Sequence, residues 1–81
     1  MPVVFRYKGY RFFFFSNEGV PREALHVHVR KGEALAKIWL EPDVSIAESY
    51  GMLSKELAEL LKVARAKQAY FRRCWNEFFG V

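Results

Sequence analysis

The sequence predicts an α+β domain: an antiparallel sheet of two β-hairpins, with or without a short fifth strand, followed by helical structure packed on one face. Lys-Gly pairs at 8–9 and 31–32 each interrupt a run rich in β-branched and aromatic residues, as hairpin turns do. Apolar residues recur every three or four positions from 57 to 78, which is typical of a helix. Residues 1–81 are expected to form one domain.

Composition and charge indicate which kinds of partner the protein is expected to bind. Of the 81 residues, 52% are hydrophobic and 17% aromatic, which suits a folded domain. Because so short a chain has a thin core, this share of aromatic rings predicts an interface, with another molecule or with a second copy in a homodimer. The net charge of +4 favours an acidic partner such as nucleic acid or an acidic protein.

The cysteine content and the first residues predict a cytoplasmic protein. The one cysteine, Cys74, excludes an internal disulfide, suits a reducing compartment and is interpreted as a packing residue. No basic segment precedes a long apolar run, and no apolar stretch approaches the roughly 20 residues that span a bilayer. We therefore expect no signal peptide and no membrane association.

The first hairpin is predicted over residues 3–15. Alternation along the strands places these aromatic residues on the core side: Phe5, Tyr7, Tyr10, Phe12 and Phe14. With a two-residue turn at 8–9, the expected cross-strand pairs are Tyr7 with Tyr10, Arg6 with Arg11, Phe5 with Phe12 and Val4 with Phe13. On the reverse face, Arg6 and Arg11 either extend into solvent or bind an anion together.

The second hairpin is predicted over residues 25–40. With 31–32 as the turn, the expected pairs are Arg30 with Glu33, His28 with Leu35 and His26 with Lys37. One face is then apolar and carries Val27, Val29, Ala34, Ala36, Ile38 and Leu40. The reverse face carries His26, His28, Arg30, Glu33, Lys37 and Trp39, with Leu35 among them.

The remaining segments complete the fold. A polar loop is expected over residues 16–23, and Pro42 ends the second hairpin. Residues 44–50 suggest a short, irregular edge strand. Ser54 is the expected N-cap of the helical region, with Glu56 in its first turn.

The helical region carries one apolar stripe, which is expected to pack on the sheet. Its members are Leu57, Leu61, Ala64, Phe71, Trp75 and Phe78, with Gln68 in line with them. The polar Gln68 leaves two alternatives, one long helix to about Phe79 or two shorter helices that meet near 66–68. Gly80 is expected to end the helical structure.

The candidate catalytic residues are His26 and His28, which share a face of one strand. Imidazole groups beside cations can cleave RNA by moving the proton of a ribose 2′-hydroxyl. The spacing also suits zinc, but zinc requires a third protein ligand, for which Glu33 and Asp43 are the possible candidates and neither is convincing; we expect no metal and no cofactor. The third interpretation is a polar surface pair that hydrogen-bonds a loop carbonyl or stacks on Trp39.

Cationic and aromatic residues near the histidines form the candidate binding surface. The expected phosphate- or partner-binding cations are Arg6, Arg11, Arg30 and Lys37. Trp39, on the polar face, is the aromatic residue expected to contact a ligand or partner.

Several runs of the sequence resemble one family. They are residues 5–14, 16–19, 21–23, 26–29, 36–42 and 75–77, including His26-Val27-His28 and a late Trp75. In these runs the chain resembles a bacterial family of small proteins catalogued as domain of unknown function four-one-six-zero, which usually has Pro where this chain has Leu25. Members are often encoded beside a second small protein, so the resemblance implies a small protein partner and a comparison with toxin–antitoxin modules.

Two functions follow as hypotheses. The first is a toxin–antitoxin-like component that contacts RNA or the translation machinery, with His26 and His28 as the acid–base pair of a ribonuclease. The second is a non-catalytic interaction protein whose basic, aromatic surface binds an acidic partner or a second copy. Sequence reasoning leaves open whether the protein is an enzyme.

Overall fold

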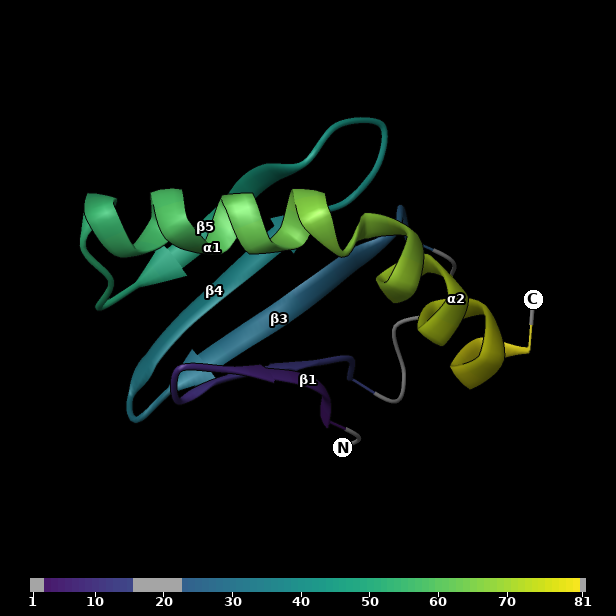
Figure 1. Ribbon diagram of the computed structural model, residues 1–81, viewed down its shortest axis with the longest axis horizontal. Coiled ribbons are helices and arrows are strands. Elements are labelled where there is room, and N and C mark those ends of the chain that lie inside the picture. Colours follow the sequence, from purple (N-terminus) through teal and green to yellow (C-terminus); the bar gives the residue numbers. More distant parts are fainter. Residues whose placement is uncertain (1–2, 16–22, 81) are drawn as a thin grey trace.

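The computed structural model describes residues 3–15 and 23–80, so most of the expected 16–23 loop lies outside the described residues. The described residues form β1 (Val3–Tyr7), β2 (Tyr10–Phe13), β3 (His26–Lys31), β4 (Ala34–Trp39), β5 (Ser45–Tyr50), α1 (Ser54–Ala66) and α2 (Gln68–Phe79). The strands make one antiparallel sheet in the order β1-β2-β3-β4-β5 (Figure 1). The predicted α+β fold, including its fifth strand, is confirmed.

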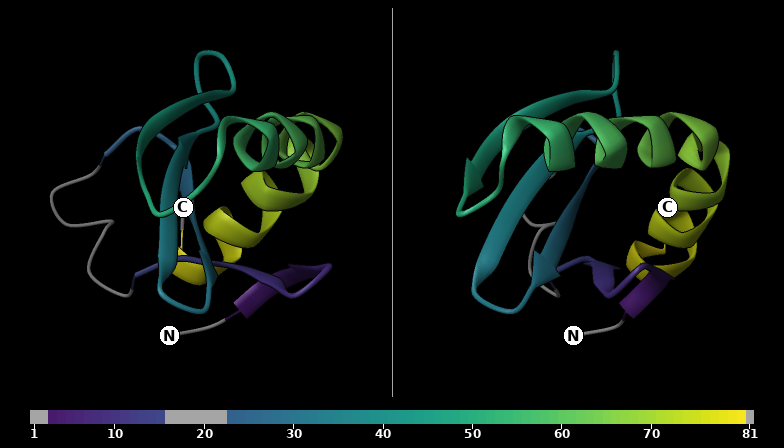
Figure 2. Two further views of the ribbon diagram at one scale, coloured as in Figure 1. Left: turned by 90° about the vertical axis from the view of Figure 1, so that its left-hand side faces the viewer. Right: turned by 60° about the vertical axis from the view of Figure 1, so that its left-hand side comes forward.

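Both helices lie on one side of a curved sheet (Figure 2). Alternation along the strands sends one set of side chains toward them, and that set forms the core. The largest fully buried apolar side chains of the core are Phe12, Val27, Val29 and Ile38 from the strands, Phe14 and Leu40 just beyond strand ends, and Leu60 and Phe71 from the helices. Cys74 packs against this cluster, as predicted. Neither helix, among the described residues, is long and apolar enough to cross a membrane.

The first hairpin has the predicted turn and, in part, the predicted register. Lys8 and Gly9 both have positive φ, 48° and 85°, as a two-residue turn that matches the strand twist requires. The pairs Phe5–Phe12, Arg6–Arg11 and Tyr7–Tyr10 are confirmed, but Val3, not Val4, lies opposite Phe13. At this irregularity in the strand pairing, the Val4 carbonyl accepts a 2.6 Å hydrogen bond from the Tyr70 hydroxyl on α2.

The predicted register of the second hairpin is wrong by two residues. Its turn is Gly32-Glu33, not Lys31-Gly32, and it pairs Lys31 with Ala34. Glycine supplies the positive φ of 60° at the first turn position, so no other residue of this turn needs that conformation. A shift of two leaves every side chain on its predicted face, which is why the apolar pattern could not detect it.

The helical region is two helices, broken at Lys67, whose φ and ψ are −108° and 14°. The Gln68 side-chain amide donates a 2.5 Å hydrogen bond to the Leu40 carbonyl, which explains a polar residue in the apolar stripe. Phe71 and Trp75 of the predicted stripe are buried, whereas Phe78, at the end of α2, is 39% exposed and is not the core residue predicted.

The start of α1 also differs from the prediction. The N-cap is Leu53 rather than Ser54, which is the first helical residue. The carboxylate of Glu56 accepts the Leu53 backbone N–H at 3.0 Å and so supplies the cap that the Leu53 side chain cannot.

Candidate functional site

The face of the sheet opposite the helices carries most of the predicted site residues. We call it the helix-free face and define it by Val3, Arg6, Arg11, Phe13, His28, Arg30, Leu35, Lys37, Glu48 and Tyr50. Cross-strand pairing places these side chains in two adjacent rows, because directly opposed residues point to the same side of a sheet. The first row is cationic, and the second lines a groove.

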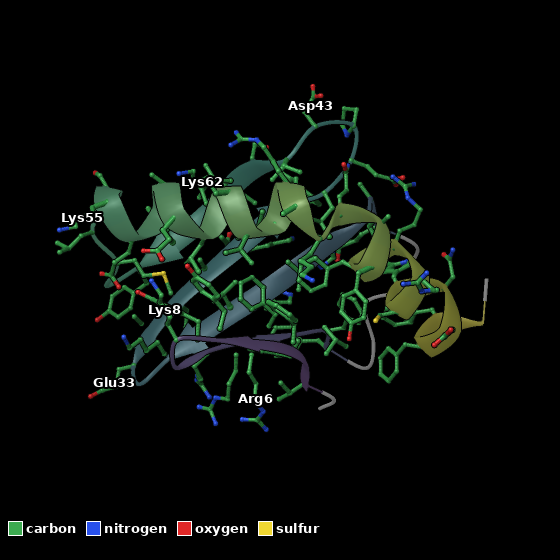
Figure 3. All side chains as sticks on the ribbon, in the orientation of Figure 1. Arg6, Lys8, Glu33, Asp43, Lys55 and Lys62 are labelled. Carbon is green, nitrogen blue, oxygen red and sulfur yellow. The ribbon has the colours of Figure 1, made fainter. Side chains whose placement is uncertain are left out.

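The cationic row crosses three strands. Arg6 pairs with Arg11, and Arg11 pairs with Arg30. All three arginines are exposed. In Figure 3, Arg6 points away from helix α1, which carries Lys62. Between residues that the structure describes, the ion pairs are Lys8–Glu59, Lys37–Glu23 and Arg72–Glu41, and none of these acids neutralises an arginine of the row.

The corrected register of the second hairpin decides which β4 residue lies opposite the end of this row. In the predicted register Arg30 would lie opposite Glu33, whose carboxylate could neutralise it. In the structure Arg30 lies opposite Leu35, and Glu33 belongs to the turn at the end of the hairpin (Figure 3). Three like charges are therefore held on adjacent strands, an arrangement that a bound anion would stabilise.

The second row lines a groove of about 410 Å³. Phe13, His28, Lys37 and Glu48 follow one another across β2, β3, β4 and β5. Aromatic rings dominate one wall, where the His28 ring centroid lies 4.3 Å from that of Phe15 and 5.7 Å from that of Phe13. Leu35 and Tyr50 complete the lining, and Tyr50 is 72% exposed.

The two histidines occupy different environments. His28 is half-buried and lines the groove, whereas His26 is fully buried. The His26 ring centroid lies 5.2 Å from that of Trp75 and 5.5 Å from that of Trp39, and its Nδ1 donates a 2.8 Å hydrogen bond to the Ala24 carbonyl. The prediction that both imidazoles lie on an exposed polar face is wrong for His26, which is fully buried and packs against Trp75 of α2.

The predicted contact residues Lys37 and Trp39 lie together. The Lys37 ammonium is 3.3 Å from the Glu23 carboxylate and 4.5 Å from the centroid of the Trp39 ring. Trp39 is half-buried opposite His26. Lys37 therefore adds less unneutralised charge to the face than any of the three arginines.

Helix α1 anchors the strands that carry Arg6 and Arg11. The Tyr10 hydroxyl donates a 2.6 Å hydrogen bond to Glu56, and the Tyr7 hydroxyl and Lys8 ammonium donate to Glu59. The Glu56 interaction, with burial, raises the pKa of Tyr10 to about 12, and the Leu53 N–H and Tyr10 hydroxyl lower the pKa of Glu56. Sequence reasoning missed this contact because no local pattern relates residues about 46 positions apart.

No group of three His, Cys, Asp or Glu side chains among residues 3–15 and 23–80 is arranged to hold a metal ion. Glu33 and Asp43, the candidate third ligands, lie at the two ends of the second hairpin. The described part of the site therefore consists of arginine side chains, aromatic rings, one accessible imidazole and the Glu48 carboxylate.

Comparison with known proteins gives one match. A family model described as "Domain of unknown function (DUF4160)" matches residues 9–76. That span includes every predicted site residue except Arg6. No curated protein and no solved structure matches the chain.

Proposed function

The chain belongs to the family described as Domain of unknown function (DUF4160), and for this member we propose that the helix-free face binds single-stranded RNA. The row Arg6–Arg11–Arg30 is the observation that carries the proposal. Guanidinium groups match phosphate oxygens in a two-point geometry, and three of them on adjacent strands can follow successive phosphates. Stabilisation by a bound polyanion explains why the fold tolerates their mutual repulsion.

The aromatic groove supports a single-stranded ligand over a duplex. Unpaired bases stack on exposed aromatic side chains, and Phe15 and Tyr50, which are 37% and 72% exposed, line the groove beside the arginine row. A five-stranded sheet is about 19 Å across its strands, from a spacing of about 4.8 Å. It cannot enter the deep, narrow major groove of an RNA duplex.

The buried state of His26 favours binding over cleavage. Ribonuclease chemistry of the kind considered for the pair requires two groups that exchange protons with the substrate. Of the two histidines only His28 reaches the groove, so we propose His28 as a contact residue and His26 as a structural one. A toxin–antitoxin-like role would then act by occupying RNA rather than by cutting it.

Salt-dependent binding tests the proposal. Fluorescence anisotropy with a labelled single-stranded RNA should give a slope of log K against log salt of about −2, because each of three phosphate contacts contributes about −0.7. Arg11→Gln should reduce the slope by about 0.7 and weaken binding about tenfold. Absence of RNA binding at low salt would refute the proposal.

A matched control separates a local contact from net charge. Arg65 is exposed on α1, so Arg65→Gln removes the same charge on the opposite side of the sheet. It should leave the slope nearly unchanged. Equal effects of Arg11→Gln and Arg65→Gln would show that only overall charge matters.

The second candidate function is non-catalytic protein binding, which a different observation favours. The apolar side chains Val3, Phe15, Leu35 and Tyr50 are 37%, 37%, 38% and 72% exposed, and all lie on or beside the helix-free face. A partner bound there would cover them. Co-purification of a stoichiometric protein partner that is lost in Tyr50→Ala and retained in Arg11→Gln would favour this function over RNA binding.

A further inference from the structure

We propose that the groove of the helix-free face is a subsite for one nucleobase and that the Glu48 carboxylate makes it selective for guanine. The inference rests on the proposed RNA binding and adds base specificity to it. The groove volume of about 410 Å³ lies within the range of about 300–1,000 Å³ typical of small-molecule sites.

The position of the groove relative to the arginine row fits one nucleotide. Arg30 and His28 are two residues apart on β3 and point to the same side, so their backbone positions are about 7 Å apart. A ribose spans this distance between a phosphate on the row and a base in the groove. The base would then lie against His28 and Tyr50, whose rings line the groove.

The carboxylate of Glu48 is the unexpected group in this groove. A negative charge beside a phosphate-binding row weakens phosphate binding, and its nearest cross-strand cation, Lys37, is paired with Glu23 instead. Among the described residues no ion pair neutralises Glu48. A contact with N–H groups of the ligand accounts for a carboxylate at this place.

Guanine is the base that best satisfies that carboxylate. Its pairing edge presents two adjacent donors, the N1–H and the exocyclic amino group, and a carboxylate accepts both at once through its two oxygens. Cytosine and adenine offer only the exocyclic amine to such an acceptor, and the N–H of uracil is flanked by two carbonyl oxygens that a carboxylate repels. Bidentate recognition of this kind gives discrimination of about tenfold or more.

Oligonucleotides with one variable base test the subsite. The probes are an all-uridine RNA and three RNAs of equal length with a single central guanine, cytosine or adenine, measured by fluorescence anisotropy. The guanine probe should bind about tenfold more tightly than the others. Glu48→Gln should remove most of that preference and leave uridine binding unchanged or stronger, whereas Glu33→Gln, the same change in the hairpin turn, should retain it.

The outcomes separate this inference from the proposed function. Binding of all four probes with a normal salt dependence but no guanine preference would overturn the base subsite alone. Preference that survives Glu48→Gln would also overturn it. Failure of every probe to bind would refute the RNA-binding function itself. Sedimentation of the protein alone completes the test. A dimer that Tyr50→Ala abolishes would show that a second copy of the protein occupies the groove. That result would refute the base subsite.

Discussion

Removing the central arginine of the row should stabilise the unliganded protein. Arg11 lies directly opposite Arg6 on one neighbouring strand and Arg30 on the other, so it forms two like-charge cross-strand pairs. Arg11→Gln removes both contacts and keeps a long polar side chain at the same place. Most surface substitutions change stability little, so a clear gain would be diagnostic of repulsion.

The magnitude follows from the register. A like-charge pair directly across two strands costs on the order of 0.2–1 kcal/mol, so the loss of two such pairs should raise the free energy of unfolding by about 1 kcal/mol. For a domain of this size that corresponds to an increase in Tm of about 4–8 °C. Arg6→Gln and Arg30→Gln each remove one pair and should give about half the effect.

Thermal unfolding at two salt concentrations is the assay. At about 0.01 M salt the Debye length is about 30 Å and repulsion acts in full, whereas at about 1 M it is about 3 Å and the gain should vanish. The exposed Arg65→Gln variant is the control for net charge. A lower Tm for Arg11→Gln, or a gain that persists at high salt, would refute the like-charge row.

Three further predictions concern the core, the hairpin anchor and the histidines. Phe71→Ala should lower the free energy of unfolding by about 3–5 kcal/mol in urea titrations, because its side chain is fully buried in the core. The pKa of Glu56 is lowered in the folded protein, so its ionised carboxylate stabilises the fold at pH values above the ordinary carboxyl value of 4.5. This contribution to the free energy of unfolding should be lost as the pH falls below that value. In unfolding titrations down to about pH 3, Tyr10→Phe should lose less stability on acidification than the unmodified protein. His26→Ala should lower Tm without a specific loss of RNA affinity at temperatures where it is folded, whereas His28→Ala should lower RNA affinity and change Tm little.

Each of these has a control or a contradicting result. Phe78→Ala removes an aromatic ring that is 39% exposed, so a cost equal to that of Phe71→Ala would contradict the assigned core. An unchanged acid profile in Tyr10→Phe would show that its hydroxyl does not support the Glu56 carboxylate. If His26→Ala abolished RNA binding while Tm stayed constant, His26 would have to reach the ligand, contrary to its burial.

Much of the fold could be predicted because its determinants are local. Side chains alternate along a strand, so residues 3–15 and 25–40 show which side chains share a face without reference to the rest of the chain. Lys8-Gly9 adopts the positive φ values that a tight hairpin turn needs, and Gln68 indicates the helix break because it interrupts the apolar stripe.

The hairpin register could not be predicted from the same pattern. An apolar pattern with a period of two determines a register only up to a shift of two residues, and Gly32 can serve as the first or the second turn position. The competing registers place Arg30 opposite either Glu33 or Leu35, and the structure has Leu35. A glutamate and a leucine opposite Arg30 are therefore equally compatible with the sequence pattern.

The sequence by itself determined the α+β class, most of the residues that share a face in the two hairpins and the basic, aromatic character of one face. Only the tertiary structure decided which of those residues meet: it set β2 beside β3 and aligned three arginines, it placed Glu48 beside the groove, and it buried His26 against Trp75. The physical reason is the distance along the sequence over which each kind of interaction acts. Alternation and turn chemistry act over a few residues, whereas contacts between strands and between α2 and the sheet depend on the packing of the whole core.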